Sequence, residues 1–241
     1  MPLAPWGVTP AGWALELSTD FNTPCPLGSW SDYDHPPPEY PYLRAYSDGW
    51  GDTNAKVMGG NSLYEPSTVV EVTNGRLVKH LHNDGAGERS AALVVGQSQT
   101  SGRYAIKFRA DQLPGFKTAW LLWPQSENWP HDGEIDFPEG SLNGTIGGFM
   151  HHQDGTYGGD QEFAATAARY GDWHIAILEW DAGKRCTFWL DGLKVGEWTN
   201  RVPSTPMHWV IQTEANIGGE RAPSGTRGVL EIDWLAMWSK A

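Results

Sequence analysis

Two segments of this chain alternate apolar and polar residues on both sides of a two-residue turn, and this pattern constrains the fold most. In VVEVTNGRLVKH, residues 69–80, the dipeptide Asn74-Gly75 separates two alternating runs. In CTFWLDGLKVGEW, residues 186–198, Asp191-Gly192 takes the same place. Both dipeptides suit a type I′ turn, in which the two central residues have positive φ. Each segment is therefore expected to form a β-hairpin.

The end of the chain shows the same alternation. In VLEIDWLAMW, residues 229–238, Glu231 and Asp233 fall between apolar residues at every second position. The one segment with weak helical character, EFAATAARY at 162–170, is short. No repeat or linker divides the chain, so we expect a single domain over residues 1–241, an all-β sandwich of two antiparallel sheets. The expected apolar face of the last strand carries Leu230, Ile232, Trp234, Ala236 and Trp238.

Prolines and cysteines give two further expectations about packing. The segment HPPPEYPY, residues 35–42, predicts a rigid surface loop bearing Tyr40 and Tyr42. Cys25 and Cys186 are the only cysteines, and the sequence alone leaves open whether they form a disulfide. We interpret them as two partly buried thiols.

Charge and hydropathy exclude several classes of partner. A net charge of −12 and a pI near 5.0 argue against nucleic acid and against anionic membrane surfaces. No apolar run is long enough to span a bilayer, so no membrane segment is expected. The start, MPLAPWGVTP, lacks the features of a signal peptide, which fits an intracellular protein or the mature portion of a secreted one. Our expectation is a secreted, extracellular protein whose signal peptide is not in this chain.

The segment GEIDFPEG, residues 133–140, places three carboxylates in an apolar stretch. In a strand, residues i and i+2 face the same way, so Glu134 and Asp136 share one face. Glu139 would face away in a regular strand, but the extra residue of a β-bulge restores its phase. Pro138 marks this bulge, because an irregular position tolerates the missing N–H. The three carboxylates are therefore expected on one face of a bulged strand.

The spacing of the two glutamates suits glycoside cleavage. Across the bulge their Cα atoms would lie roughly 13 Å apart. Side chains that lean together would leave a carboxyl separation of about 5–6 Å, as in retaining glycosidases. Crowding keeps at least one carboxyl protonated near neutral pH, and the group titrates as a coupled set. With the proton on Glu139, that residue is the general acid, Glu134 is the ionised nucleophile, and Asp136 hydrogen-bonds to Glu134.

The alternative for this segment is a calcium loop or a solvated acidic turn. Calcium loops usually alternate Asp and Asn, with Gly at the turn. Ile135 and Phe137 between the acids instead favour a strand with a buried rear face.

The chain resembles glycoside hydrolase family 16, the laminarinase and β-glucanase family. EIDFPE at 134–139 matches the family's bulged E-x-D-x-x-E motif. The preceding TAWLLWPQSENWPHDGEID resembles the family's aromatic approach, with Trp120, Trp129 and Gly133 at matching positions. Further segments extend the resemblance over nearly the whole chain: DFNTP, FMHHQDG, DWHIAILEW, FWLDG and VLEIDWLAMW.

The resemblance implies a β-jelly roll of the concanavalin type with a cleft on its concave sheet. It also implies a retaining, endo-acting hydrolase of β-1,3- or mixed-linkage β-glucan, with Glu134 as nucleophile, Asp136 as its assistant and Glu139 as acid/base. The expected partner is a polysaccharide substrate, no cofactor is required, and we expect a monomer. Some relatives bind a structural calcium on the far side of the fold, and Asp233 is the candidate for it here.

Several residues are candidates for binding sugar. Trp129, five residues before Glu134, is expected to stack on a sugar ring, and an ordinary core role is the alternative. One of His151 and His152 must face the cleft while the other faces away, and we favour His152. The remaining candidates are Trp120, Lys107, Gln212 and Glu214. Cleft walls are expected among Trp123, Trp30, Tyr33 and Trp50, each of which has packing as its alternative.

The sequence departs from the family pattern in three places. The first is the pair of adjacent histidines, His151 and His152, where the family has one. GRYAIKFR at 102–109 puts Lys107 where a sugar-contacting arginine is usual, and a lysine lacks the guanidinium fork. GFKTAW lacks the usual W-P-A-F. The alternatives to a β-glucanase are a relative that acts on a β-galactan such as agar or carrageenan, a transglycosylase, and a non-catalytic glycan-binding protein. The presence of all three carboxylates argues against the last.

Overall fold

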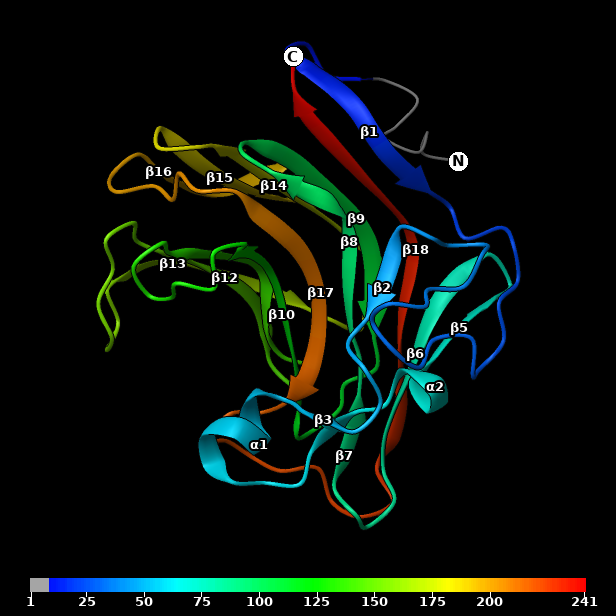
Figure 1. The fold of residues 1–241 in the computed structure, drawn as a ribbon. Helices are drawn as coiled ribbons and strands as arrows, with labels where there is room; N and C mark the ends of the chain where they lie inside the picture. Colours follow the sequence, from blue (N-terminus) through cyan, green and yellow to red (C-terminus); the bar gives the residue numbers. More distant parts are fainter. Residues whose placement is uncertain (1–8) are drawn as a thin grey trace.

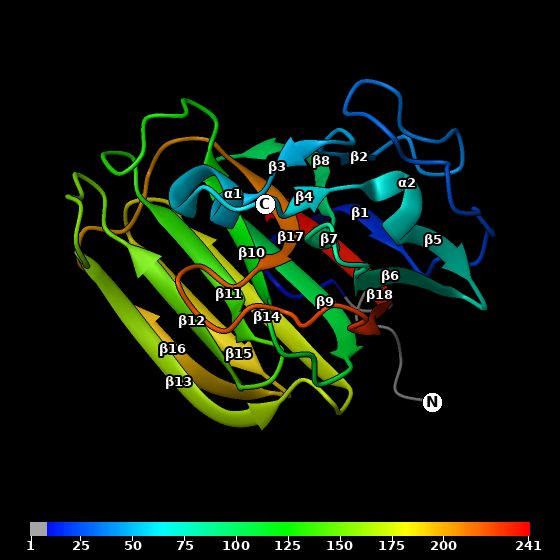
Figure 2. The ribbon, with the colours of Figure 1, turned by 90° about the horizontal axis from the view of Figure 1, so that it is seen from below.

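The computed structural model of the protein describes residues 9–241, which form two β-sheets packed face to face (Figure 1). We name the seven-stranded sheet the cleft sheet and the eleven-stranded sheet the back sheet. The views from two directions show β14–β16 of the back sheet lying over β12 and β13 of the cleft sheet (Figures 1 and 2). This arrangement confirms the predicted all-β jelly-roll sandwich.

The strands follow a jelly-roll order rather than the order of the sequence. The cleft sheet runs β13 (Gln161–Arg169), β12 (Thr145–His151), β11 (Glu134–Ser141), β10 (Phe116–Pro124), β17 (Met207–Ala215), β8 (Ala92–Gln99) and β2 (Leu43–Ala45). The back sheet runs β16 (Leu193–Trp198), β15 (Arg185–Leu190), β14 (His174–Asp181), β9 (Gly102–Ala110), β18 (Arg227–Lys240), β6 (Arg76–Asn83), β7 (Glu88–Ser90), β4 (Leu63–Tyr64) and β3 (Trp50–Gly51). In addition, β1 (Trp13–Thr19) pairs with β18 and β5 (Val70–Thr73) with β6.

Two short helices, α1 (Thr53–Met58) and α2 (Pro66–Val69), lie between the early strands. No helix in the described part of the chain is long and apolar enough to cross a membrane.

Aromatic pairs join the two sheets across the core. Trp120 of β10 meets Phe108 of β9 edge-on, with ring centroids 4.8 Å apart. Phe137 of β11 stacks on Phe188 of β15 at 4.6 Å. All four side chains are buried, and each buried aromatic side chain of this kind contributes about 1.5–3 kcal/mol to folding.

Both predicted hairpins are confirmed. Asn74 and Gly75, between β5 and β6, have φ of 51° and 71°, as a type I′ turn requires. Asp191 and Gly192, between β15 and β16, have φ of 51° and 82°.

The final strand does not carry its apolar residues on one face, and that prediction is wrong. In the pairing of β18 with β9, Ile232 lies opposite Phe108 and Trp234 opposite Lys107, which leaves Asp233 as an extra, bulged residue. The bulge reverses the alternation. Leu230 and Ile232 enter the core between the sheets, and so do Leu235 and Met237, whereas Trp234, Ala236 and Trp238 pack in a separate cluster of buried residues.

Three other expectations are also corrected. The segment predicted to be weakly helical is strand β13, because pairing with β12 satisfies its backbone and overrides a weak helical preference. Residues 35–42 form a loop without helix or strand, as predicted, but Tyr40 does not face the surface. It is buried against Trp30, and its hydroxyl donates to the Thr23 carbonyl. Cys25 and Cys186 are free thiols, fully rather than partly buried.

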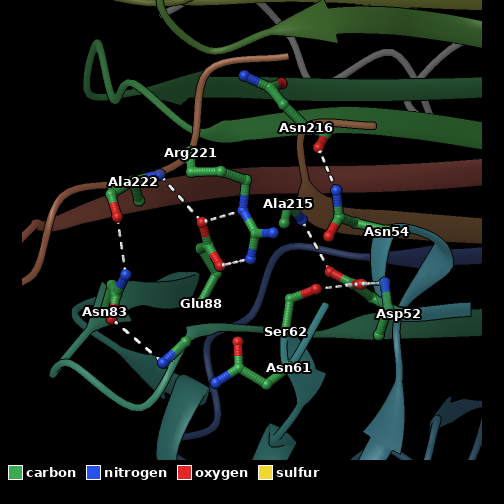
Figure 3. A network of polar contacts seen from close by, with 12 residues as sticks. Asp52, Asn54, Asn61, Ser62, Asn83, Glu88, Ala215, Asn216, Arg221 and Ala222 are labelled. Atoms are coloured by element: carbon green, nitrogen blue, oxygen red, sulfur yellow. Dashed lines mark hydrogen bonds and ion pairs between the residues drawn. The ribbon is translucent and has the colours of Figure 1, made fainter. Parts of the chain in front are cut away.

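A polar network ties α1 and the segment after β17 to the sheets (Figure 3). Asp52 caps α1, and its carboxylate also accepts hydrogen bonds from the Ser62 hydroxyl and the Ala215 N–H at the end of β17. Arg221 pairs with the buried Glu88 of β7. These contacts anchor the connections that border one end of the cleft.

Candidate active site

The bulge predicted in β11 is confirmed by the strand register. Opposite β10, Ala119 pairs with Glu139 and Leu121 with Asp136, so two residues of β11 face one of β10. The same irregularity separates Asp136 from Glu139 in the pairing of β11 with β12. Because of this extra residue, Glu134, Asp136 and Glu139 all line one cleft.

The neighbouring strand leaves room for the bulge. Gly148 of β12 lies beside it, and a Cβ on Gly148 would come within 2.7 Å of the Asp136 carbonyl oxygen and of the Phe137 ring. Ile135 and Phe137 point into the core, as the alternation predicted. The core side of β11 therefore fixes the orientation of the carboxylates on its other side.

The cleft has a volume of about 550 Å³ and combines charged and apolar walls. Ala119 and Leu121 line it beside the carboxylates. Trp129 is in the wall, as expected, and it stacks on Trp123, with ring centroids 6.4 Å apart and an interplanar angle of 14°. Two parallel indoles beside Glu134 offer a flat apolar surface to a sugar ring.

Glu134 and Asp136 hold protons more tightly than ordinary carboxyls. Burial raises the pKa of Glu134 to about 8, with the charge of Glu139 adding to the rise and a hydrogen bond to Asp136 opposing it. Burial and the charges of Glu134 and Glu139 raise the pKa of Asp136 well above its usual range. A proton shared by the pair therefore belongs on Asp136, whose O–H donates to Glu134.

His151, not His152, faces the cleft, so the preference for His152 is wrong. His151 Nε2 lies 3.5 Å from an Asp136 carboxylate oxygen. Burial lowers the pKa of His151 to about 4, so its ring is neutral at neutral pH. His152 turns away, and its two ring nitrogens contact the carboxylates of Asp160 and Glu162.

Glu139 contacts a cation. Lys117 Nζ of β10 donates to Glu139 Oε1 over 2.6 Å, and Glu214 Oε1 of β17 lies 3.9 Å from the same nitrogen. Both Lys117 and Glu139 are largely buried, and Glu214 is almost completely buried. Gln212 and Glu214 both line the cleft, where the sequence placed them.

Two predicted sugar contacts lie elsewhere, and both predictions are corrected. Trp120 is fully buried in the core, because β10 alternates and its cleft-facing positions are the odd-numbered ones. Lys107 is on β9 of the back sheet, where it pairs with Asp233 at 2.7 Å. Trp30 is also a core residue, whereas Trp123 lines the cleft.

In the described part of the chain, one cluster of side chains has its donor atoms close enough together to hold a metal ion. Single donor atoms of Glu134, Asp136 and His151 all lie within 4.8 Å of one another. Asp233, the candidate for calcium, is not in a cluster of this kind among residues 9–241 and is paired with Lys107 instead.

Sequence reasoning missed Lys117 and the wall formed by α1. Thr53 and Val57 of α1, together with Ile217, border the cleft near Glu214. Tyr64 also lines it, and its hydroxyl donates to Glu214. Lys117 lies two residues before Ala119 in a buried strand, so the sequence could have shown that both side chains face the cleft. The sequence does not show that a distant strand brings Glu214 beside Lys117.

Comparison with known proteins supports the fold. A family model described as "Glycosyl hydrolases family 16" matches residues 56–236. Among solved structures, the chain is similar to SCLam, a non-specific endo-beta-1,3(4)-glucanase, at 19% identity and a TM-score of 0.74, covering 97% of this chain and 94% of that one. A mutant of SCLam presents 1,3-beta-D-cellobiosyl-glucose at its active site.

Two further solved structures share the fold. The laminarinase from Rhodothermus marinus matches at 19% identity and a TM-score of 0.73, covering 95% of this chain and 98% of that one. Another match is a structure described with endo-acting O-glycanases that members of the human gut microbiota express to initiate mucin breakdown. It has 17% identity and a TM-score of 0.73, and the match covers 96% of this chain and 92% of that one. A search of curated protein sequences gave no match.

Proposed function

The chain belongs to family 16 of the glycosyl hydrolases, and from that premise we propose that it is a retaining, endo-acting hydrolase of β-1,3- or mixed-linkage β-glucan. The observation that supports this proposal is the bulged strand β11, which directs three carboxylates into one cleft. The similarity to endo-beta-1,3(4)-glucanases and laminarinases supports the choice of β-glucan.

In the proposed first step, Glu134 attacks the anomeric carbon as the glycosidic C–O bond breaks. Glu139 gives its proton to the departing oxygen, and a covalent glycosyl-enzyme forms. In the second step, Glu139 takes a proton from water, the water oxygen bonds to the anomeric carbon, and Glu134 is released as a carboxylate.

Asp136 supports the nucleophile in this scheme. Its protonated carboxyl donates a hydrogen bond to Glu134, which offsets part of the rise that burial causes in the Glu134 pKa and stabilises the ionised form that attacks. Neutral His151 lies beside both carboxylates without adding a charge that would trap the nucleophile in an ion pair. Trp129 and Trp123 supply the stacking surface beside Glu134.

The experiment that tests the proposal is a polysaccharide panel with chromatographic analysis of the products. Laminarin, curdlan, lichenan, xyloglucan, agarose, κ-carrageenan and a mucin are each incubated with the wild type, Glu134→Gln and Glu71→Gln. Glu71 lies on β5 of the back sheet, so Glu71→Gln is the matched control. We expect oligosaccharides from laminarin or lichenan with the wild type and the control, and none with Glu134→Gln.

Two outcomes would contradict the proposal. Wild-type turnover by Glu134→Gln would remove Glu134 as nucleophile. Products from agarose, κ-carrageenan or mucin alone would reassign the substrate while leaving the reaction class in place. Proton NMR of the first product released fixes the stereochemistry, because a retaining enzyme releases the β-anomer first.

A further inference from the structure

Lys117 is a buried cation at the centre of the cleft whose ammonium faces two carboxylates from opposite sides. It lies on β10, between β11 and β17, and in the strand register it pairs directly with Glu214. Its Nζ is 2.6 Å from Glu139 Oε1 and 3.9 Å from Glu214 Oε1, both within ion-pair distance. One cation thus serves two acids, and one of the two is the proposed acid/base.

Glu214 is held in a way that directs one oxygen toward Lys117. Its Oε2 accepts hydrogen bonds from the Thr53 N–H at the start of α1 and from the Tyr64 hydroxyl, both over 3.3 Å. Oε1 is the oxygen that faces the ammonium. Because Glu214 is only 1% exposed, burial raises its pKa, and the charge of Lys117 is the largest effect that opposes this rise and favours the ionised form.

The proposed reaction changes the charge of Glu139 twice. Glu139 is neutral before the first proton transfer, ionised in the glycosyl-enzyme, and neutral again after water has given up its proton. A fixed ion pair with Lys117 would favour only the ionised state. A second carboxylate within reach of the same ammonium provides a partner for the states in which Glu139 is neutral.

Resting on the proposed function, we propose that Lys117 is a positioning residue that pairs with Glu139 when this carboxylate is ionised and with Glu214 when Glu139 carries the proton. Lys117 then stabilises both charge states of the acid/base without contacting the sugar's reacting atoms. The pKa of Lys117 itself is consistent with this role, since burial lowers it but the charges of Glu139 and Glu214 raise it by more.

Other titratable groups near Glu139 also affect its protonation, in addition to its ion pair with Lys117. The groups that interact with Glu139 are Glu134 and Asp136 on β11, Lys117 on β10 and the Tyr170 hydroxyl before β14. Glu214 on β17 contacts Lys117, and His151 on β12 contacts Glu134 and Asp136. Lys117 is the one cation among these groups at neutral pH, so its removal has a predictable sign.

The test follows the titration of Glu139 directly, by carbon-13 NMR of labelled glutamate carboxyls, with Glu139→Gln identifying the signal. Lys117→Met should move the titration midpoint of Glu139 up by about one pH unit or more, because an opposite charge this close favours the ionised form. Glu214→Gln should move it down, because the ammonium is then left to Glu139 alone. In the profile of kcat/KM against pH, the limb set by the ionisation of Glu139 should move to higher pH in Lys117→Met and to lower pH in Glu214→Gln.

Controls separate electrostatics from folding. Lys107→Met removes a lysine that pairs with Asp233 on the back sheet, and it should leave the midpoint unchanged. Lys117→Arg keeps the charge and should restore most of the wild-type midpoint. If Lys117→Met is unstable because Glu214 is left unpaired, Lys117→Met combined with Glu214→Gln removes both charges and should still raise the midpoint.

Two results would overturn the proposal. A Glu139 midpoint in Lys117→Met equal to that of Lys107→Met would show that the ion pair has no influence. Movement in the same direction for Lys117→Met and Glu214→Gln would rule out the exchange between two partners. The NMR titration needs no substrate, so a protein that hydrolyses none of the panel would refute the proposed function without deciding this question.

Discussion

At the scale of single residues, the cleft concentrates negative charge where little water can reach it. Asp136 is only 2% exposed and lies against Glu134, and His151 lies beside both carboxylates. Burial of these carboxyls disfavours their charged forms and raises both pKa values. An active site built this way is expected to lower the stability of the fold, since the unfolded chain ionises these groups freely.

We therefore predict that Glu134→Gln stabilises the protein at alkaline pH. The folded-state pKa of Glu134 is raised to about 8, so the unfolded chain releases this proton at a lower pH than the folded protein does. The free energy of unfolding therefore falls as the pH rises above the unfolded pKa and through 8. A neutral glutamine has no such loss. Relative to the wild type, Glu134→Gln should gain little free energy of unfolding at pH 4.5. At pH 8.5 the gain should exceed about 1 kcal/mol, which corresponds to roughly 2–4 °C in Tm at this chain length.

Thermal unfolding followed by circular dichroism across this pH range is the measurement. Glu71→Gln on the back sheet is the control for loss of one negative charge. A gain that is equal at pH 4.5 and pH 8.5, or equal to that of the control, would show that burial of Glu134 is not its cause.

At the scale of secondary-structure elements, two β-bulges decide which side chains face where. The bulge in β11 brings Glu139 into phase with Asp136, and the bulge at Asp233 moves the second half of β18 out of phase with its first half. Each acts because side chains alternate with a period of two, so one extra residue reverses every later position. The bulge in β11 also needs space on β12, which Gly148 provides.

Gly148→Ala should damage the site and the fold together. The new Cβ would lie 2.7 Å from the Asp136 carbonyl oxygen, so β11 or β12 must shift, at a cost of roughly 1–3 kcal/mol. Because the shift falls at Asp136, kcat should fall by about tenfold or more. Gly171→Ala is the control, since no heavy atom lies within 4 Å of its added Cβ. Denaturant unfolding and initial rates measure both effects, and equal behaviour of the two variants would contradict this account of the bulge.

At the scale of the whole molecule, the cleft depends on connections between segments that are far apart in the sequence. α1 lies beside the end of β17 (Figure 1), and Asp52 joins the two through Ala215. Arg221 and Glu88 join the segment after β17 to β7 (Figure 3). Burial raises the pKa of Glu88, but hydrogen bonds from Arg221 and from the Ala222 N–H outweigh it and leave this pKa below its usual value.

Arg221→Gln should therefore destabilise the fold by roughly 1–3 kcal/mol at neutral pH, because it leaves the buried Glu88 carboxylate without its cation. A carboxylate with a depressed pKa contributes stability that is lost as the pH falls through that pKa. The difference from the wild type should consequently shrink in acid. Arg227→Gln, at the exposed start of β18, is the control in the same Tm measurements. A difference that persists unchanged at pH 3 would assign the effect to packing of the arginine rather than to its charge.

Local patterns in the sequence predicted much of the fold. Type I′ turns depend on two adjacent residues, and the alternation around β11 placed Ile135 and Phe137 in the core. The local pattern failed at β18, where nothing in the sequence marks the bulge at Asp233 in the way that Pro138 marks the bulge in β11. It failed again at β13, where pairing with β12 decided the conformation.

By itself, the sequence determined that three carboxylates lie on one face of a bulged strand, because that arrangement depends only on residues close together in the chain. The tertiary structure alone decided what surrounds them. It selected His151 over His152, removed Trp120 and Lys107 from the cleft, and brought Lys117 and Glu214 together. These outcomes depend on which strands are neighbours and on their register, and contacts of that kind form between segments too far apart in sequence for any local pattern to specify.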